Sequence, residues 1–303
     1  MSKSFSIPGT PRHSAGFTLL EAVMVIVITG ILAGIVAVFI TKPVQGYVDS
    51  VRRAELTDAA DVVVRRMARE VHLAVPNSLR VGDSSGNSGS CDSQPGVTCY
   101  IEFILTSGGG RYRDATTDGS SAGGNSLSFT STSIKTFDVL GMMPSNPAIA
   151  AGDYIVIYNL GPGNAPADAY VNADPCVNCN RAKVSTVDSA NQVVTLVSNP
   201  FGAWMAGMHP PYNSFQVVPG GVKAVTYACP TVSSGDLTRY WNYGFNASLA
   251  TVPSGTSALL ATHVTCTGVS FFAGLLSITI TLTDPNSNES VTLFREIHVD
   301  NTP

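Results

Sequence analysis

Three short patterns in this chain of 303 residues contain side chains that could take part in catalysis or bind a metal. Gly82 to Gly86 match Gly-X-Ser-X-Gly with Ser84 at the centre, the pattern of a hydrolase nucleophile elbow. An elbow needs a strand before the serine and a helix after it, whereas a Ser-, Gly- and Asn-rich loop follows here. A hydrolase would also need a histidine beside the serine, and nothing in the sequence places His209, His263 or His298 there. We therefore expect that the protein is not an enzyme.

The second pattern is Cys176-X-X-Cys179, within a total of six cysteines. Thioredoxin-like redox chemistry would need a βαβ context, and a zinc site would need a second pair of ligands, and the sequence indicates neither. An even number of cysteines is typical of a protein from an oxidising compartment, although the sequence alone does not fix their pairing. Proximity along the chain favours three structural disulfides: Cys91–Cys99, Cys176–Cys179 and Cys229–Cys266.

The third pattern is a run of oxygen-bearing side chains, Asp284, Asn286, Asn288 and Glu289. Calcium loops place ligands at alternate positions in this way, but the run lacks the mid-loop glycine and the distal bidentate glutamate of an EF-hand. Asp, Asn and Pro are equally typical of a turn between two strands. We favour the turn, keep calcium as the alternative, and expect no cofactor.

One further carboxylate, Glu21, lies beside a long apolar run. The 19 residues from Ala22 to Ile40 carry no charge, which is long enough for a helix that spans a membrane. A carboxylate at the start of such a run is costly unless a cation lies nearby. If the chain is cut after Gly16, the new α-amine of Phe17 supplies that cation, and in a filament the amine of a neighbouring subunit could do so.

These residues resemble a known signature. Gly16-Phe17-Thr18-Leu19-Leu20-Glu21, after a basic leader and before an apolar helix, is similar to the N-terminus of type IV pilins and type II secretion pseudopilins. The resemblance implies that a prepilin peptidase cuts between Gly16 and Phe17 and methylates Phe17, and that Glu21 guides docking into a growing filament. An ordinary signal anchor is the alternative.

The same resemblance implies the partners and the location. The partners would be other major and minor pilins, the prepilin peptidase and an assembly platform in the inner membrane. The chain would cross the bacterial inner membrane once, through residues 17–40, with its head in the periplasm, and would then join a fibre or its tip at the cell surface.

Three later segments, residues 71–81, 237–244 and 296–303, look like the minor pilins of mannose-sensitive haemagglutinin (MSHA) type pili. Such minor pilins resemble the J pseudopilin of type II secretion, which belongs to a tip complex that primes assembly. This resemblance implies an initiator or tip subunit. Two alternatives remain: a minor pseudopilin of a secretion machine, and an adhesive tip module whose loops bind a surface ligand.

The charge composition limits the possible partners. The chain has 17 basic and 21 acidic residues, or 13% charged residues, whereas a typical soluble domain has about 25%. The formal net charge of −4 argues against a protein that holds nucleic acid through its bulk charge, so we expect no nucleic acid.

The chemistry-bearing residues must be positioned by a long helix and a β-rich head. An apolar stripe predicts that the helix continues to Val75, before Pro76, with the stripe formed by Val44, Val48, Val51, Ala59, Val63, Met67 and Val71. Gly30, Gly34, Pro43 and Gly46 are positions where this helix could bend or melt.

Beyond the helix, short apolar stretches rich in Val, Ile, Thr and Tyr alternate with Gly-, Ser- and Asn-rich loops. They predict strands at 98–105, 127–130, 153–158, 193–197, 215–218, 222–229, 263–272, 275–282 and 291–299.

We therefore expect an α+β, pilin-like fold: a long N-terminal helix packed on an antiparallel sheet, with large loop insertions that could form a second sheet. The expected parts are a leader at 1–16, a transmembrane and filament-core helix at 17–40, an amphipathic helical stem at 41–76 and a β-rich head at 77–303.

Overall fold

A computed structural model describes residues 16–114, 123–171, 174–204, 210–232, 234–249, 251, 253–299 and 301–302. The chain forms two compact units, Met1–Ala54 and Glu55–Pro303, which are described separately. Of the expected leader, only Gly16 lies within the described residues.

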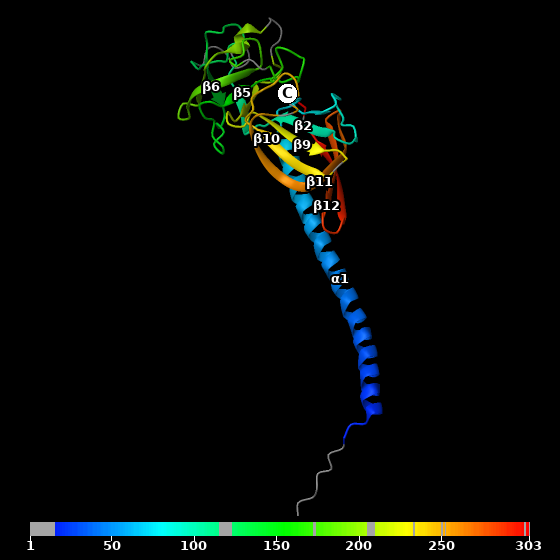
Figure 1. The fold of residues 1–303 in the computed structure, drawn as a ribbon. Helices are drawn as coiled ribbons and strands as arrows, with labels where there is room; N and C mark the ends of the chain where they lie inside the picture. The colour runs from blue at the N-terminus through cyan, green and yellow to red at the C-terminus, as the bar shows by residue number, and fades with distance from the viewer. Residues whose placement is uncertain are drawn as a thin grey trace, which may run out of the picture. The chain divides into compact units, whose positions relative to one another are not determined.

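Helix α1 covers Leu19–His72 and contributes to both units (Figure 1). By length and composition, the helix contains a stretch that is long and apolar enough to cross a membrane. No residue of that stretch is buried. The helix continues through Gly30, Gly34, Pro43 and Gly46, so these positions do not interrupt it. It ends at His72, three residues before the predicted end at Val75. The next two N–H groups, of Leu73 and Ala74, bond to carbonyls three residues back instead of four, so the α-helical pattern stops there.

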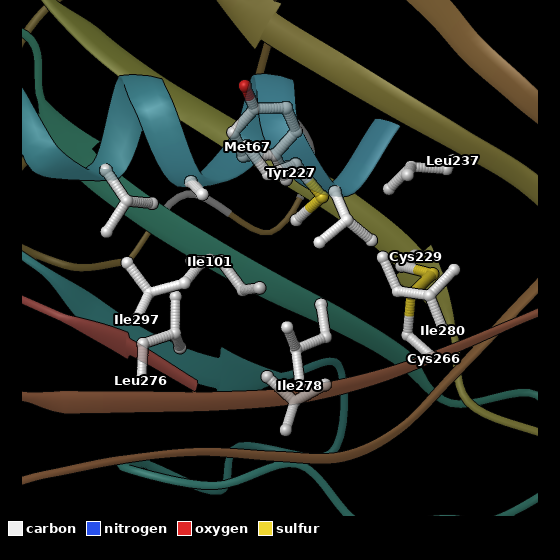
Figure 2. Close-up of a cluster of buried hydrophobic side chains, with 14 of the residues drawn as sticks. Met67, Ile101, Tyr227, Cys229, Leu237, Cys266, Leu276, Ile278, Ile280 and Ile297 are labelled. Atoms are coloured by element: carbon white, nitrogen blue, oxygen red, sulfur yellow. A yellow bond between two sulfur atoms is a disulfide. The ribbon is translucent and has the colours of Figure 1, made fainter. Parts of the chain in front are cut away.

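The last five turns of α1 belong to the second unit and have one buried face. Val63, Met67 and Val71 are buried there as predicted, but Ala59 is exposed and its neighbour Ala60 is fully buried. Val44, Val48 and Val51, the first three positions of the predicted stripe, are also exposed in the single chain, so the buried face begins only at Ala60. Figure 2 shows Met67 on the side of the helix that faces the sheet, with Tyr227 beside it and Ile101 below it.

The helix packs on an antiparallel sheet of seven strands, in the order β1-β2-β9-β10-β11-β12-β13. Side chains alternate across this sheet: along β12, Leu276, Ile278 and Ile280 enter the core, whereas Ser277 and Thr279 face away. The strands are β1 Arg80–Asp83, β2 Thr98–Ile104, β9 Ala224–Pro230, β10 Gly235–Trp241, β11 Thr256–Phe272, β12 Leu275–Thr283 and β13 Ser290–His298.

Six further strands close into a β-barrel, in the order β3-β4-β7-β6-β5-β8. They are β3 Gly108–Tyr112, β4 Thr136–Leu140, β5 Tyr154–Val156, β6 Arg181–Asp188, β7 Val193–Leu196 and β8 Ser214–Val218. The barrel has its own core, in which Phe137 and Phe215 pack edge to face and Trp204 packs on Phe201. The expected large insertions are thus mostly this one folded barrel.

The whole barrel is inserted between two strands that are direct neighbours in the sheet, β2 and β9. The chain leaves the sheet and returns to it at one place, where the Leu105 N–H donates to the Lys223 carbonyl over 3.2 Å. Without the insertion, the seven-stranded sheet would be a simple meander. The barrel therefore adds a module to a complete pilin-like α+β scaffold.

The strand predictions were correct at eight positions and wrong at one, since residues 127–130 form no strand. Strands β1, β3, β4, β6 and β10 were not predicted. β3 begins Gly108-Gly109-Gly110, which reads as a loop. A Cβ at Gly109 would lie 2.7 Å from the Phe215 carbonyl oxygen, so close packing of β3 on β8 requires glycine there.

Candidate functional site

The expected processing site lies directly before the first turn of α1. Gly16, Phe17 and Thr18 are not helical, and the side chain of Phe17 is 78% exposed. Thr18 is the N-cap: its Oγ1 accepts a hydrogen bond from the Glu21 N–H at 3.2 Å, and its carbonyl accepts one from the Ala22 N–H at 3.1 Å. The Gly16–Phe17 bond therefore lies in an accessible, non-helical segment.

The structure gives Glu21 a local role that the sequence reasoning missed. Thr18-X-X-Glu21 has the spacing of a capping box, and an acidic residue in the first turn also interacts favourably with the helix dipole. The Thr-X-X-Glu spacing is the sequence signal that could have identified Thr18. The Glu21 side chain is exposed in the single chain, so it is accessible to a partner.

A largely apolar surface follows this site, with its uncharged part between Ala22 and Ile40. Every residue from 16 to 51 is exposed in the single chain, including Phe17, Leu20, Ile31 and Phe39. So large an apolar surface is not stable in water and requires lipid or other protein chains to cover it.

Inside the second unit, a charged cluster fixes α1 to the sheet. Glu70 Oε2 accepts hydrogen bonds from the Tyr227 hydroxyl and from Arg239 Nε, each at 2.8 Å, and Arg66 lies 3.6 Å from the other carboxylate oxygen. The Arg239 guanidinium also lies 4.8 Å from the centre of the Trp241 ring. Burial, and then the neighbouring Glu70 carboxylate, raise the pKa of Tyr227, so its hydroxyl remains a donor.

A second buried cluster joins the other face of the sheet to the loops beside it. Glu102 is fully buried, lies 2.8 Å from the Arg80 guanidinium and accepts a hydrogen bond from the Tyr243 hydroxyl at 2.8 Å. The Arg80 guanidinium stacks 3.8 Å from the centre of the Tyr170 ring, and Tyr170 belongs to the inserted segment. The buried charges are paired, as a structural role requires.

The cysteines form disulfides, and the Gly82–Gly86 segment forms a turn. Disulfides join Cys91 to Cys99, Cys176 to Cys179 and Cys229 to Cys266, the pairs that proximity favours. Ser84 follows β1 in a turn and no helix comes after it, so the context of a nucleophile elbow is absent from this described segment. Of the histidines, His263 and His298 are exposed on β11 and β13, whereas His209 lies outside the described residues.

The calcium candidate forms the turn between β12 and β13. Asp284 Oδ1 accepts a hydrogen bond from the Asn286 N–H at 3.0 Å, and Asp284 Oδ2 accepts one from the Ser287 hydroxyl at 2.8 Å. The Asp284 N–H donates to the Glu289 carbonyl and the Asn288 N–H to the Asp284 carbonyl, which closes the turn. Within the described part of the chain, no three His, Cys, Asp or Glu residues group together as metal ligands.

Comparison with known proteins locates one family signature. Residues 11–37 match the prokaryotic N-terminal methylation motif, which includes the Gly16–Phe17 junction, Glu21 and the apolar start of α1. No curated protein and no solved structure matches the chain. The methylation motif and the α+β fold together support a type IV pilin-like protein.

Proposed function

We propose that this protein is a minor pilin of an MSHA-type pilus, of the kind named MshO, and that it helps to start the fibre or forms part of its tip. The methylation motif at residues 11–37 supports a pilin that the prepilin peptidase processes. The resemblance of residues 71–81, 237–244 and 296–303 to MSHA-type minor pilins supports the narrower assignment.

In this proposal the leader, residues 1–16, is removed and residues 17–40 anchor the chain in the inner membrane. Residues 41–76 form the stem, and residues 77–303 form a head that is exposed first to the periplasm and later on the fibre. Assembly would cover the apolar surface of residues 22–40 with the helices of other pilins.

One observation carries the proposal: an exposed Gly16–Phe17 junction precedes a capped helix whose first turn holds Glu21 and whose following surface is uncovered and apolar. A peptidase needs the accessible junction, and a filament needs the apolar surface. An enzyme or a soluble binding protein needs neither.

Mass spectrometry of the mature chain tests the proposal. We expect an N-terminus at Phe17 that carries one additional methyl group. The control is the same chain from a strain without prepilin peptidase, which should retain Met1 or its initiator-processed form. An unprocessed N-terminus in a strain with active peptidase would exclude the pilin assignment.

The inserted barrel favours one second candidate, an adhesive tip module, because the α+β scaffold is complete without it. An adhesin predicts that changes in the barrel loops abolish attachment and leave the number of fibres normal. An initiator predicts the loss of fibres. A minor pseudopilin predicts a defect in secretion, with pili unaffected.

A further inference from the structure

A cleft lies on the face of the sheet that points away from α1. Its volume is about 310 Å3, and strands β2, β9 and β10 provide most of its lining. We call it the tyrosine groove; the lining residues that matter below are Thr98, Tyr100, Ala228, Asp236, Thr238, Tyr240 and Thr251.

The strand register explains why the sheet is hollow here. Tyr100, Ala228 and Thr238 form one row across the three strands, because Ala228 pairs with Tyr100 on one side and with Thr238 on the other. The methyl group of Ala228 is the smallest side chain of the row and forms the floor. Tyr240 follows two residues after Thr238 on the same face, so the floor has an aromatic side chain on each side.

Two disulfides hold two of the three strands of the groove, β2 and β9, from the opposite face. Cys99 lies between Thr98 and Tyr100, and Cys229 follows Ala228 directly. Cys99 and Cys229 are paired in register, and each is also crosslinked, to Cys91 and to Cys266 respectively. Figure 2 shows the Cys229–Cys266 bridge within the core under α1. The groove is therefore preorganised, which lowers the entropy cost of binding a ligand.

The chemistry of the lining indicates the class of ligand. Hydroxyl groups, which both donate and accept hydrogen bonds, come from Thr98, Tyr100, Thr238, Tyr240 and Thr251. The described lining includes no Lys, Arg or His that could bind an anion, and its one carboxylate, Asp236, is exposed to solvent and so offers little to a cation. Burial raises the pKa of Tyr100 and outweighs the hydrogen bond with the Thr98 side chain, which lowers it; the neighbouring Tyr240 raises it further, so the phenol stays neutral.

A matching ligand is uncharged, both donates and accepts hydrogen bonds, and has an apolar face for the tyrosine rings and Ala228. We propose that the tyrosine groove binds a neutral sugar unit, with ring hydroxyls hydrogen-bonded to the threonines and tyrosines. The proposal rests on the groove alone and is independent of the proposed pilus role.

Saturation-transfer NMR on the full chain tests the proposal. The chain is kept in a detergent without a sugar headgroup, and the probes are the methyl glycosides of glucose, galactose, mannose and N-acetylglucosamine. We expect saturation of the ring C–H protons of at least one glycoside, with a Kd of about 1 mM, typical of a small ligand with few contacts.

Ala228→Leu should fill the floor and weaken binding at least tenfold, whereas Thr281→Val is the matched control. Thr281 lies on the same outward face, but on β12 and outside the groove, so its variant should bind like the wild type. If Ala228→Leu melts below the wild-type temperature, Tyr240→Ala replaces it, with the same expected loss.

Three results would overturn the proposal: no glycoside binds to the wild type, both groove variants bind normally, or tetramethylammonium displaces the glycoside at equal concentration. The last result would identify a cation site instead. None of them depends on whether the chain is processed or assembled, so a failure here leaves the pilin assignment untouched.

Discussion

Arg239 of β10 donates a hydrogen bond from Nε to Glu70 of α1 over 2.8 Å, and the exposed fractions of the two side chains are only 8% and 16%. The contact joins residues that are far apart in the sequence and belong to different layers of the second unit. It is therefore a specific attachment of the helix to the sheet, in addition to apolar packing.

Removal of the Glu70 side chain should destabilise the second unit. Glu70→Ala leaves the Arg239 guanidinium largely buried without its carboxylate, so we expect a loss of about 3 kcal/mol in the free energy of unfolding. Tyr227→Phe removes only one hydrogen bond to Glu70 and should cost about 1 kcal/mol. Urea unfolding followed by tryptophan fluorescence measures both. Glu55→Ala, an exposed position on the same helix, is the control, and an equal loss there would refute the argument.

Asp83 should make the stability of the second unit depend on acid pH. Burial raises the pKa of Asp83, but hydrogen bonds from the Asp92 N–H, from the side chain and N–H of Asn87 and from the Ser85 N–H outweigh burial, so its pKa is lowered from its ordinary value. A lowered pKa in the folded state stabilises the protein fully above the unfolded value, and this contribution is lost as pH falls through the folded pKa.

The test compares the wild type with Asp83→Asn at several pH values. The wild type should be more stable by a constant amount from pH 7 to pH 5, and the difference should shrink below about pH 4. Urea midpoints at pH 7, 5, 4 and 3 give the result. A difference that grows on acidification would show that the Asp83 carboxylate does not hold this loop.

The three disulfides should contribute unequally. In the chain-entropy view a longer closed loop gives more stability, so the separations of 37, 8 and 3 residues predict losses of about 4, 2.5 and 1.5 kcal/mol when each bridge is removed. The order is Cys229–Cys266, then Cys91–Cys99, then Cys176–Cys179. Paired Cys→Ser variants, compared by thermal unfolding without reductant, test it, and a reversed order would show that local packing dominates.

Substitutions at Thr18 and Glu21, at the start of α1, should affect helix capping and filament assembly separately. Thr18→Ala removes the cap and should weaken the start of the helix by about 1 kcal/mol, whereas Thr18→Ser retains the hydroxyl and should not. Glu21→Ala should insert into the membrane normally but reduce the number of fibres. Membrane fractionation and fibre counts by electron microscopy measure these effects. Normal piliation by Glu21→Ala would remove its docking role.

The sequence predicted the features that depend on local patterns. The uncharged run from Ala22 to Ile40, the buried stripe through Val63, Met67 and Val71, and the eight apolar strands all leave a periodic signal. The Gly-Phe junction and Glu21 are recognisable because their types and spacing are themselves the signal. The first four stripe positions, Val44, Val48, Val51 and Ala59, were wrong, because the same apolar spacing continues along a part of the helix that no sheet covers.

Features that depend on distant contacts could not be predicted. Strand β3 is glycine-rich and forms because β8 approaches it closely, and closure of the barrel requires six pairings that no local pattern specifies. The Glu70–Arg239 pair and the tyrosine groove also arise only when separate segments meet. Ala228 has no distinctive sequence context, yet its register between Tyr100 and Thr238 creates the groove.

The insertion of the barrel between β2 and β9 has a consequence for the order of folding. Long loops are slow to close because their entropy must be lost before the ends make contacts, so β2 cannot easily find β9 while the segment between them is unfolded. A barrel that forms first brings Leu105 and Lys223 together and turns a distant pairing into a local one. Pulse-labelled hydrogen exchange should therefore show barrel amides protected before those of β2 and β9. Until the barrel forms, β1 and β2 can pair only with each other, and the sheet that holds α1 is the last part to be completed.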